Sequence, residues 1–136
     1  MLTRDRQPYS FALLRAVPHP YTGAGVPVGL VLQSRPAEFI GLEAVTDPDR
    51  LRRLAPGVDV ELLSRYLRSC RAIARGEASA GEIALLSAPE RFHWLTAPRS
   101  DVIQPGPLQH GVTENPAATL RELFEKHVPS DRASSD

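Results

Sequence analysis

Three apolar segments near the N-terminus restrict the fold of this chain more than any other feature. Residues 9–17 (YSFALLRAV), 26–34 (VPVGLVLQS) and 37–45 (AEFIGLEAV) are rich in the aliphatic and aromatic residues that favour strands. The connections between them are shorter than the crossover of a dozen or more residues that parallel neighbours require. The sequence therefore predicts a meander of three antiparallel strands. Pro27 lacks a backbone N–H, so we expect it at a strand start or at a sheet edge.

A helical hairpin is predicted to follow these strands. The TDP motif at residues 46–48 combines a capping side chain with a proline in the first turn, which is typical of a helix start. Pro56-Gly57 ends this short helix, and residues 60–75 form a second, clearer helix that stops before Gly76. The predicted apolar face of the second helix consists of Leu62, Leu63, Tyr66, Leu67, Cys70, Ile73 and Ala74.

The second half of the chain is predicted to add short strands to the sheet. The apolar run EIALLS at 82–87 favours a strand, and so does the alternation of polar and apolar residues in RFHWLT at 91–96. SDVIQ at 100–104 is a third candidate strand. Nearby prolines predict that 97–112 is a shaped loop outside regular structure.

These elements predict an α+β fold, with an antiparallel sheet of about four to six strands packed against a helical hairpin and a C-terminal helix. The C-terminal helix is expected to start after Asn115 and to end at Pro129. A chain of 136 residues, 42% of them apolar, is expected to form one domain. We expect a flexible N-terminus at residues 1–8, a single domain at 9–128 and a disordered tail at 129–136.

The charge balance argues against general attraction to nucleic acid or to a membrane. Acidic and basic residues number 16 each, so the formal net charge is zero. A basic surface is still possible locally, on the face of the 60–75 helix formed by Arg65, Arg68, Arg71 and Arg75. This face is either a solvated helix surface or a surface for nucleic acid or an acidic partner. The helix macrodipole favours cations near the C-terminal end, which supports the first interpretation.

The cysteine content and the first residues predict a cytoplasmic location. The single cysteine, Cys70, excludes an intramolecular disulfide and most cysteine-based metal sites, and its place on the apolar helix face predicts a core residue. The opening residues MLTRDRQPYS lack the apolar stretch of a signal peptide, and no apolar run approaches membrane-spanning length. We therefore expect no membrane partner.

Side chains suited to recognition are most concentrated at residues 91–111. Arg99 follows Pro98, which pre-organises its guanidinium to bind a carboxylate or a phosphate. The predicted set for a ligand or a partner is Arg91, Arg99, Ser100 and Gln104. The alternative is that Arg99 pairs with a nearby acid, Glu90 or Asp101, and only stabilises the loop.

His93 and His110 are the candidate general acid–base residues, because histidine titrates near neutral pH. A hairpin formed by 91–95 and 100–104 would place His93 beside the loop. The spacing of the histidines matches no compact metal-binding motif, so we predict no metal site and no cofactor. Ser100 lacks the Gly-x-Ser-x-Gly context of a nucleophile elbow, which argues against serine catalysis there.

The stretch ERFHWLTAPRSDVIQPGPLQHG, followed by NPAATLRELFEKHV, resembles an uncharacterised bacterial family, domain of unknown function 3037. YSFALLRAVPHP and VPVGLVLQ resemble that family's opening strands, and WLTAPRS and VIQ are the most specific segments of the likeness. The resemblance covers residues 9–128 and implies a small cytoplasmic bacterial protein, without an established activity. Members are often encoded beside a protein that resembles the persistence-type kinases, which implies a protein partner.

Two departures from this family put any shared chemistry in doubt. The segment GAGVPVGL has neither the acidic residue nor the asparagine that members carry around the start of the second strand. Asp101 stands where members tend to have threonine. If those polar groups carry chemistry in the relatives, this chain has lost or altered it.

The sequence favours a binding or accessory module over an enzyme. We predict action with a protein partner, with a kinase-like protein as one candidate, through the loop that contains Arg99. The alternative is an enzyme for a phosphate- or carboxylate-bearing substrate, with arginine clamps and His93 or His110 as acid or base. A second alternative is nucleic-acid binding through the arginine face at 65–75. The ligand and the oligomeric state do not follow from the sequence.

Overall fold

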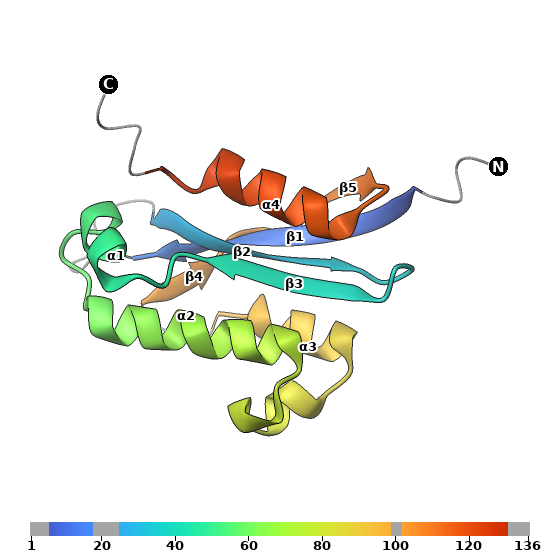
Figure 1. Ribbon diagram of the computed structural model, residues 1–136, viewed down its shortest axis with the longest axis horizontal. Helices are drawn as coiled ribbons and strands as arrows, with labels where there is room; N and C mark the ends of the chain where they lie inside the picture. The colour runs from blue at the N-terminus through green and yellow to red at the C-terminus, as the bar shows by residue number, and fades with distance from the viewer. Residues whose placement is uncertain (1–5, 18–24, 99–101, 131–136) are drawn as a thin grey trace.

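The computed structural model describes residues 6–17, 25–98 and 102–130, and these residues form the predicted α+β fold (Figure 1). The strands are β1 (Gln7–Ala16), β2 (Val26–Ser34), β3 (Phe39–Ala44), β4 (Ile103–Pro105) and β5 (Gln109–Thr113). The α-helices are α1 (Pro48–Leu54), α2 (Val60–Arg75), α3 (Ala88–Leu95) and α4 (Pro116–His127). None of the helices in these ranges is long and apolar enough to cross a membrane.

The strands form one antiparallel sheet, in which β3, β2 and β1 lie in that order. This confirms the predicted meander. β4 and β5 share the other edge of β1, with β4 along its C-terminal part and β5 along its N-terminal part. Between these two strands the register shifts, because residues 12–13 of β1 lie opposite residues 106–108. The N–H of Gly106 donates to the carbonyl of Leu13 at 2.8 Å and closes this bulge.

Helices cover both faces of the sheet, with α2 and α3 on one face and α4 on the other (Figure 1). β1 contributes to both cores because successive side chains of a strand point to opposite faces. Ala12 and Leu14 belong to the larger core with Leu67 of α2, whereas Phe11 belongs to a smaller core with Leu120 of α4. The face covered by α2 and α3 therefore holds most of the apolar side chains.

The predicted helix ends are confirmed. Asp47, Asp59 and Asn115 each cap a helix with a side-chain oxygen, which accepts a backbone N–H of the first turn at 3.0, 3.1 and 3.1 Å, respectively. Gly76 ends α2 in the left-handed conformation, with φ of 72°. Leu62 was predicted on the buried face of α2 but is 41% exposed, because it lies in the first turn at the border of that face.

Two predicted strands are wrong. Residues 82–87 contain a short 3-10 helix, Glu82–Leu85, and residues 91–96 lie largely in α3. For residues 91–96 the reason is local: Ser87 and Glu90 form a capping box at the start of α3, in which the Ser87 hydroxyl accepts the N–H of Glu90 at 3.4 Å and the Glu90 carboxylate accepts the N–H of Ser87 at 3.1 Å. Side-chain and backbone hydrogen bonds from Ser87 also lower the pKa of the Glu90 carboxyl.

The same helix removes the hairpin that was expected between 91–95 and 100–104. Phe92 and Leu95 are both buried, and their spacing of three residues places them on one face of α3. A strand would have brought Phe92 and Trp94 to one face, whereas Trp94 is only half-buried. The helix therefore packs by helical spacing, and the polar–apolar alternation of the segment is coincidental.

The region 97–112, predicted as an irregular loop, contains β4 and most of β5. β4 starts at Ile103, within the candidate strand at 100–104, and residues 99–101 lie outside the described ranges. β5 was not predicted because its sequence, QHGVT, lacks a buried apolar face. Its pairing with β1 fixes a strand there that local sequence does not favour.

Candidate functional site

An open pocket of about 190 Å³ lies where β5, β1 and β2 run side by side. The strands and the β2–β3 connection contribute all of its lining: Pro8, Tyr9, Ser10, Gln33, Arg35, Pro36, His110 and Gly111. Among the described residues, no acidic residue and no residue of α2 or α3 lines this pocket. Figure 1 shows the start of β1 and the β2–β3 hairpin at the end of the sheet beyond those two helices.

Strand register aligns three polar side chains across the pocket. Ser10 lies opposite His110 of β5 on one side and opposite Gln33 of β2 on the other. Residues directly opposite each other in a sheet project to the same face. Ser10 also shares its face with Ala12 and Leu14, which face α2 and α3. The three polar side chains therefore continue the surface that those helices cover further along β1.

Ser10 and His110 form a hydrogen bond within this row. The Ser10 Oγ and the His110 Nδ1 are 2.9 Å apart. The hydroxyl can donate to the imidazole nitrogen or accept from it, depending on the tautomer. A hydroxyl beside an imidazole is also the arrangement of an activated nucleophile and its base. This pair is the closest approach to catalytic geometry in the pocket.

Gln33 is the most deeply buried polar side chain of the pocket, with only 9% of its surface exposed. Its Oε1 atom has no hydrogen-bond partner among the described residues. A buried, unsatisfied polar atom costs about 1–3 kcal/mol of stability. The Gln33 amide can therefore form a further hydrogen bond, for which the described part of the chain supplies no partner.

Arg35 provides the positive charge. It lies two residues after Gln33, at the start of the β2–β3 connection, where its side chain is exposed and lines the pocket. No described residue forms an ion pair or a hydrogen bond with its guanidinium. Guanidinium binds carboxylate and phosphate groups through paired N–H donors. Its described lining contains Arg35 and a histidine but no carboxylate, so the pocket is complementary to an anionic group.

The structure places one predicted residue, His110, in this pocket. His93 lies exposed in the last turn of α3 and does not line the pocket. Gln104 lies exposed on β4, opposite Arg15. Arg99 and Ser100 lie outside the described residues, so the loop that they were predicted to form is not described.

Arg91 has two hydrogen bonds at the junction of α2 and α3. Its Nη1 donates to the carbonyl of Leu86 at 2.7 Å, and its Nη2 donates to the carbonyl of Ala74 at 3.4 Å. Its Nε has no partner among the described residues and is buried. The guanidinium thus holds the end of α2 to the segment before α3, and Arg91 is absent from the lining of the pocket.

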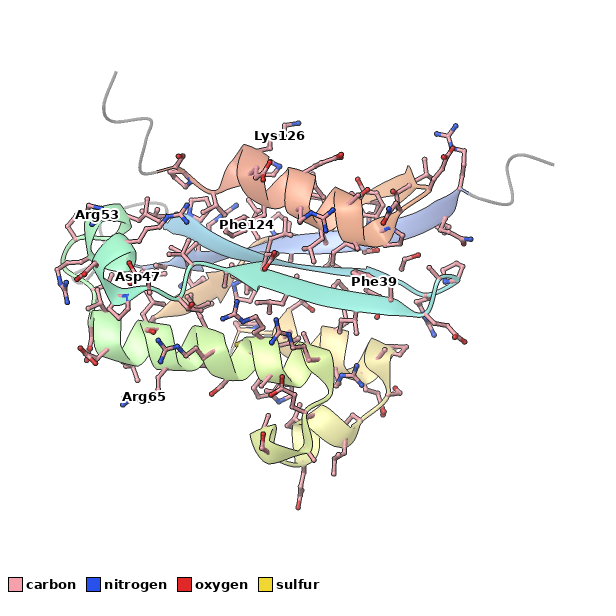
Figure 2. All side chains as sticks on the ribbon, viewed as in Figure 1. Phe39, Asp47, Arg53, Arg65, Phe124 and Lys126 are labelled. Atoms are coloured by element: carbon pink, nitrogen blue, oxygen red, sulfur yellow. The ribbon has the colours of Figure 1, made fainter. Side chains whose placement is uncertain are left out.

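The four arginines of the predicted α2 face differ in their surroundings. Arg65 and Arg68 are exposed, and Figure 2 shows Arg65 pointing away from the sheet. Arg71 donates to the Thr46 hydroxyl at 3.4 Å, and Arg75 lies 3.7 Å from Glu77. The residues are therefore on one helix, but two of them also contact neighbouring polar groups.

No described group of three or more His, Cys, Asp or Glu residues is arranged to hold a metal ion. Cys70 is buried in the larger core, as predicted, and burial raises the pKa of its thiol to about 12. A thiol with so high a pKa is a poor nucleophile at neutral pH. The pocket residues are thus the best-supported candidates for function.

Ser10, Gln33 and Arg35 were missed by the sequence analysis. A weak signal was present, because Ser10 and Gln33 are polar positions inside otherwise apolar strands. Such positions also occur at ordinary strand ends, so their meaning depends on what lies opposite them. That information came only from the register of β5, β1 and β2.

A family model described as "Protein of unknown function (DUF3037)" matches residues 11–128. The matched range includes Gln33, Arg35 and His110, whereas Ser10 lies just before it. A search of curated proteins and a search of solved structures found no match. The family match thus covers most of the chain, and it assigns no chemistry to the pocket.

Proposed function

Because the chain belongs to the DUF3037 family, which brings no known activity with it, we propose a function from the pocket itself. The protein is a binding module that holds an anionic group of its partner between β5, β1 and β2. The anion contacts Arg35 and the amide of Gln33, beside the Ser10–His110 pair. Binding through the Arg99 loop stays a prediction, since residues 99–101 lie outside the described ranges.

The unsatisfied amide of Gln33 is the observation that carries this proposal. A side chain with 9% exposure and an unpaired Oε1 lowers the stability of the free protein. Rotation about its last side-chain bond exchanges its donor and acceptor groups at little cost. After this rotation the Gln33 Nε2 takes the place of the unpaired Oε1 and donates to an anion in the pocket. A site that binds a ligand often keeps such a local cost to stability.

The charges of the lining support an anion over a cation. The Arg35 guanidinium is always charged, and no described carboxylate of the lining neutralises it. Pro8 and Pro36 add apolar surface on which the body of a ligand can pack. We propose that the anion belongs to a protein partner in the cytoplasm of a bacterium, with a kinase-like protein as one candidate.

The test is a titration of the ¹⁵N-labelled protein with acetate and with inorganic phosphate, followed by NMR. We expect saturable shifts of the amide signals of Ser10, Gln33 and Gly111 with at least one of the two anions. Arg35→Ala should weaken this binding about tenfold, because a charge-assisted hydrogen bond is lost. Arg68→Ala, which removes an exposed arginine on α2, is the matched control and should bind as the wild type does. Absence of a saturable shift with both anions would reject the proposal.

The Ser10–His110 hydrogen bond favours a second candidate, an enzyme that acts on a phosphate- or carboxylate-bearing substrate. In this case Ser10 is the nucleophile, His110 accepts its proton, and Arg35 binds the anionic group of the substrate. A fluorophosphonate probe tests the nucleophile: the Ser10 oxygen would form a bond to phosphorus, fluoride would leave, and the proton would pass to His110. Mass spectrometry should find the adduct on Ser10, and none on Ser10→Ala. An unlabelled wild-type protein would reject this candidate.

A further inference from the structure

We propose that the partner's binding segment is an extended peptide, which adds to the outer edge of β5 as an antiparallel strand. This inference rests on the proposed function, because it names the kind of partner that brings the anionic group to the pocket. Its basis is the orientation of the β5 backbone together with the side chains that the edge presents. Peptide addition of this kind obtains affinity from main-chain hydrogen bonds and specificity from alternate side chains.

The backbone groups of His110 and Val112 point away from the sheet. The N–H of Val17 bonds the carbonyl of Val102, and the N–H of Gly106 bonds the carbonyl of Leu13. Odd-numbered residues of β1 therefore bond toward the edge that β4 and β5 share. The register places the odd-numbered residues of β5 directly opposite the odd-numbered residues of β1, so these residues bond each other. Along a strand, successive residues direct their N–H and carbonyl groups to opposite edges. The even-numbered residues of β5 consequently direct their N–H and carbonyl groups outward.

These outward groups are unpaired in the part of the chain that the structure describes, where no further backbone hydrogen bond reaches residues 109–113. The edge also lacks usual features that prevent strand addition, since QHGVT contains no aspartate, glutamate, lysine, arginine or proline. Val112 is 55% exposed, and Leu108, just before β5, is 48% exposed. The edge thus offers free backbone groups flanked by apolar side chains.

The side chains of the edge define the chemistry of the peptide. A peptide residue opposite His110 projects to the same face as His110, beside the pocket that contains Arg35. Because Arg35 lines this pocket and no described acid does, an acidic residue is favoured at that position. A residue opposite Val112 is favoured to be apolar. In the antiparallel direction the peptide meets Val112 first, so the expected pattern is apolar–any–acidic.

The experiment uses a capped peptide with valine and glutamate two residues apart, and its binding to the full chain is measured by calorimetry. N-methylation of the glutamate removes an N–H that faces β5 and should weaken binding about tenfold. N-methylation of the intervening residue removes an N–H that faces solvent and should leave the affinity within about twofold. Equal effects of the two methyl groups, or none of either, would overturn strand addition.

Variants of Val112 give a second measurement. Val112→Pro removes the outward N–H at an edge position, where proline is tolerated, and should weaken peptide binding at least about tenfold. Val112→Thr keeps the backbone donor and should bind the peptide within about threefold of the wild type. Circular dichroism and the NMR spectrum check that both variants fold. If Val112→Pro is folded and binds the peptide as tightly as Val112→Thr does, the proposal is wrong.

The anion titration separates this inference from the proposed function. Val112→Pro should still show the acetate or phosphate shifts, because its side chain does not line the pocket. Anion binding without peptide binding would reject the strand and keep the pocket, whereas loss of both in the wild type would reject the proposed function as well. A free protein that is already a dimer through β5, and becomes monomeric in Val112→Pro, would also overturn the peptide as the occupant of this edge.

Discussion

The even-numbered side chains of β1 all project to the face that carries α2 and α3, but they differ in chemistry between the two halves of the strand. In the C-terminal half, Ala12, Leu14 and Ala16 are almost completely buried in the core formed with α2 and α3. In the N-terminal half, Pro8 is exposed and Ser10 is half-buried in a polar pocket. The same strand thus supports a close-packed core at one end and a candidate binding site at the other.

The difference follows from where the helices end. α2 and α3 supply apolar partners for the C-terminal half, so apolar burial stabilises the fold there. None of their residues lines the pocket, where Gln33 is left with an unpaired Oε1. Binding sites are where the rules of stable packing are expected to be broken. We call the C-terminal half of β1, with the residues of α2 and α3 that pack on it, the covered half. The N-terminal half of β1, with the other pocket residues, is the open half. Substitutions in the covered half should therefore change mainly stability, and substitutions in the open half should change mainly binding.

The largest expected effect belongs to the covered half. Leu67→Ala should lower the free energy of unfolding by about 3–4 kcal/mol, because it leaves a cavity where a leucine with 0% exposure packs. Leu62→Ala, on the same helix but at 41% exposure, is the matched control and should cost less than about 1 kcal/mol. Urea denaturation measures both values. Similar losses in the two variants would contradict the assignment of the core.

The next effect concerns pH and again belongs to the covered half. Burial raises the pKa of Cys70 from 9.0 to about 12, so the thiol ionises more readily in the unfolded chain than in the folded one. Its contribution to stability is complete below pH 9 and is lost as the pH rises toward 12. At about pH 10.5 the loss should be about 2 kcal/mol.

Cys70→Ala is the control for this pH effect, because it removes the thiol and keeps the other titrating groups. The free energy of unfolding of both proteins is measured from pH 8 upward, and the wild type should fall more steeply. Parallel curves for the two proteins would show that water reaches Cys70 in the folded state. That result would contradict the claim that the core of the covered half excludes water, in contrast to the open half.

In the open half, replacing a polar residue by an apolar one should raise the free energy of unfolding. Gln33→Met replaces the unpaired amide by an apolar chain of similar length and should raise the free energy of unfolding by about 1 kcal/mol. The same variant should weaken binding of the anion, since the amide is lost. Gln104→Met, at an exposed position of β4, is the control and should change stability by less than about 0.5 kcal/mol. A destabilised Gln33→Met protein would mean that the amide is satisfied in solution.

Local signals predicted most of the elements in both halves. The apolar runs of β1, β2 and β3 and the short links between them leave antiparallel pairing as the simplest arrangement. The capping residues Asp47 and Asn115 mark helix starts because a side-chain oxygen near the first turn satisfies backbone N–H groups wherever the helix lies in the fold. Such signals require no knowledge of the rest of the chain.

The errors lie where local signals are short or contradictory. α3 spans eight residues, and over that length a polar–apolar alternation at Phe92 and Trp94 is as visible as helical spacing. The capping box of Ser87 and Glu90 was the better signal and was overlooked. β5 carries no apolar pattern because it is an edge strand beside a polar pocket, so only its pairing with β1 reveals it.

Of the residues that line the candidate site, the sequence predicted only His110. The others were missed because the chain topology brings them together. His110 was identified from its chemistry, but its partner Ser10 is 100 residues away in the chain. Their contact depends on β5 returning to the edge of β1 in a register that also sets Gln33 opposite Ser10. No spacing in a single sequence encodes that arrangement, whereas the buried contacts of α2 follow from a periodicity within 16 residues.

The smallest stability effect is expected at the Ser10 hydroxyl, which makes an exposed hydrogen bond to His110. Ser10→Ala should change the free energy of unfolding by less than about 0.5 kcal/mol, because water can replace the lost partner. Ser34→Ala is the matched control: its hydroxyl is completely buried and donates to the carbonyl of Pro8 at 2.9 Å. Its loss should cost about 1 kcal/mol, since a hydrogen bond of a completely buried hydroxyl is lost. Equal costs for the two serines in urea denaturation would place Ser10 in the packed part of the fold, and the boundary between the covered and the open half would move toward the start of β1.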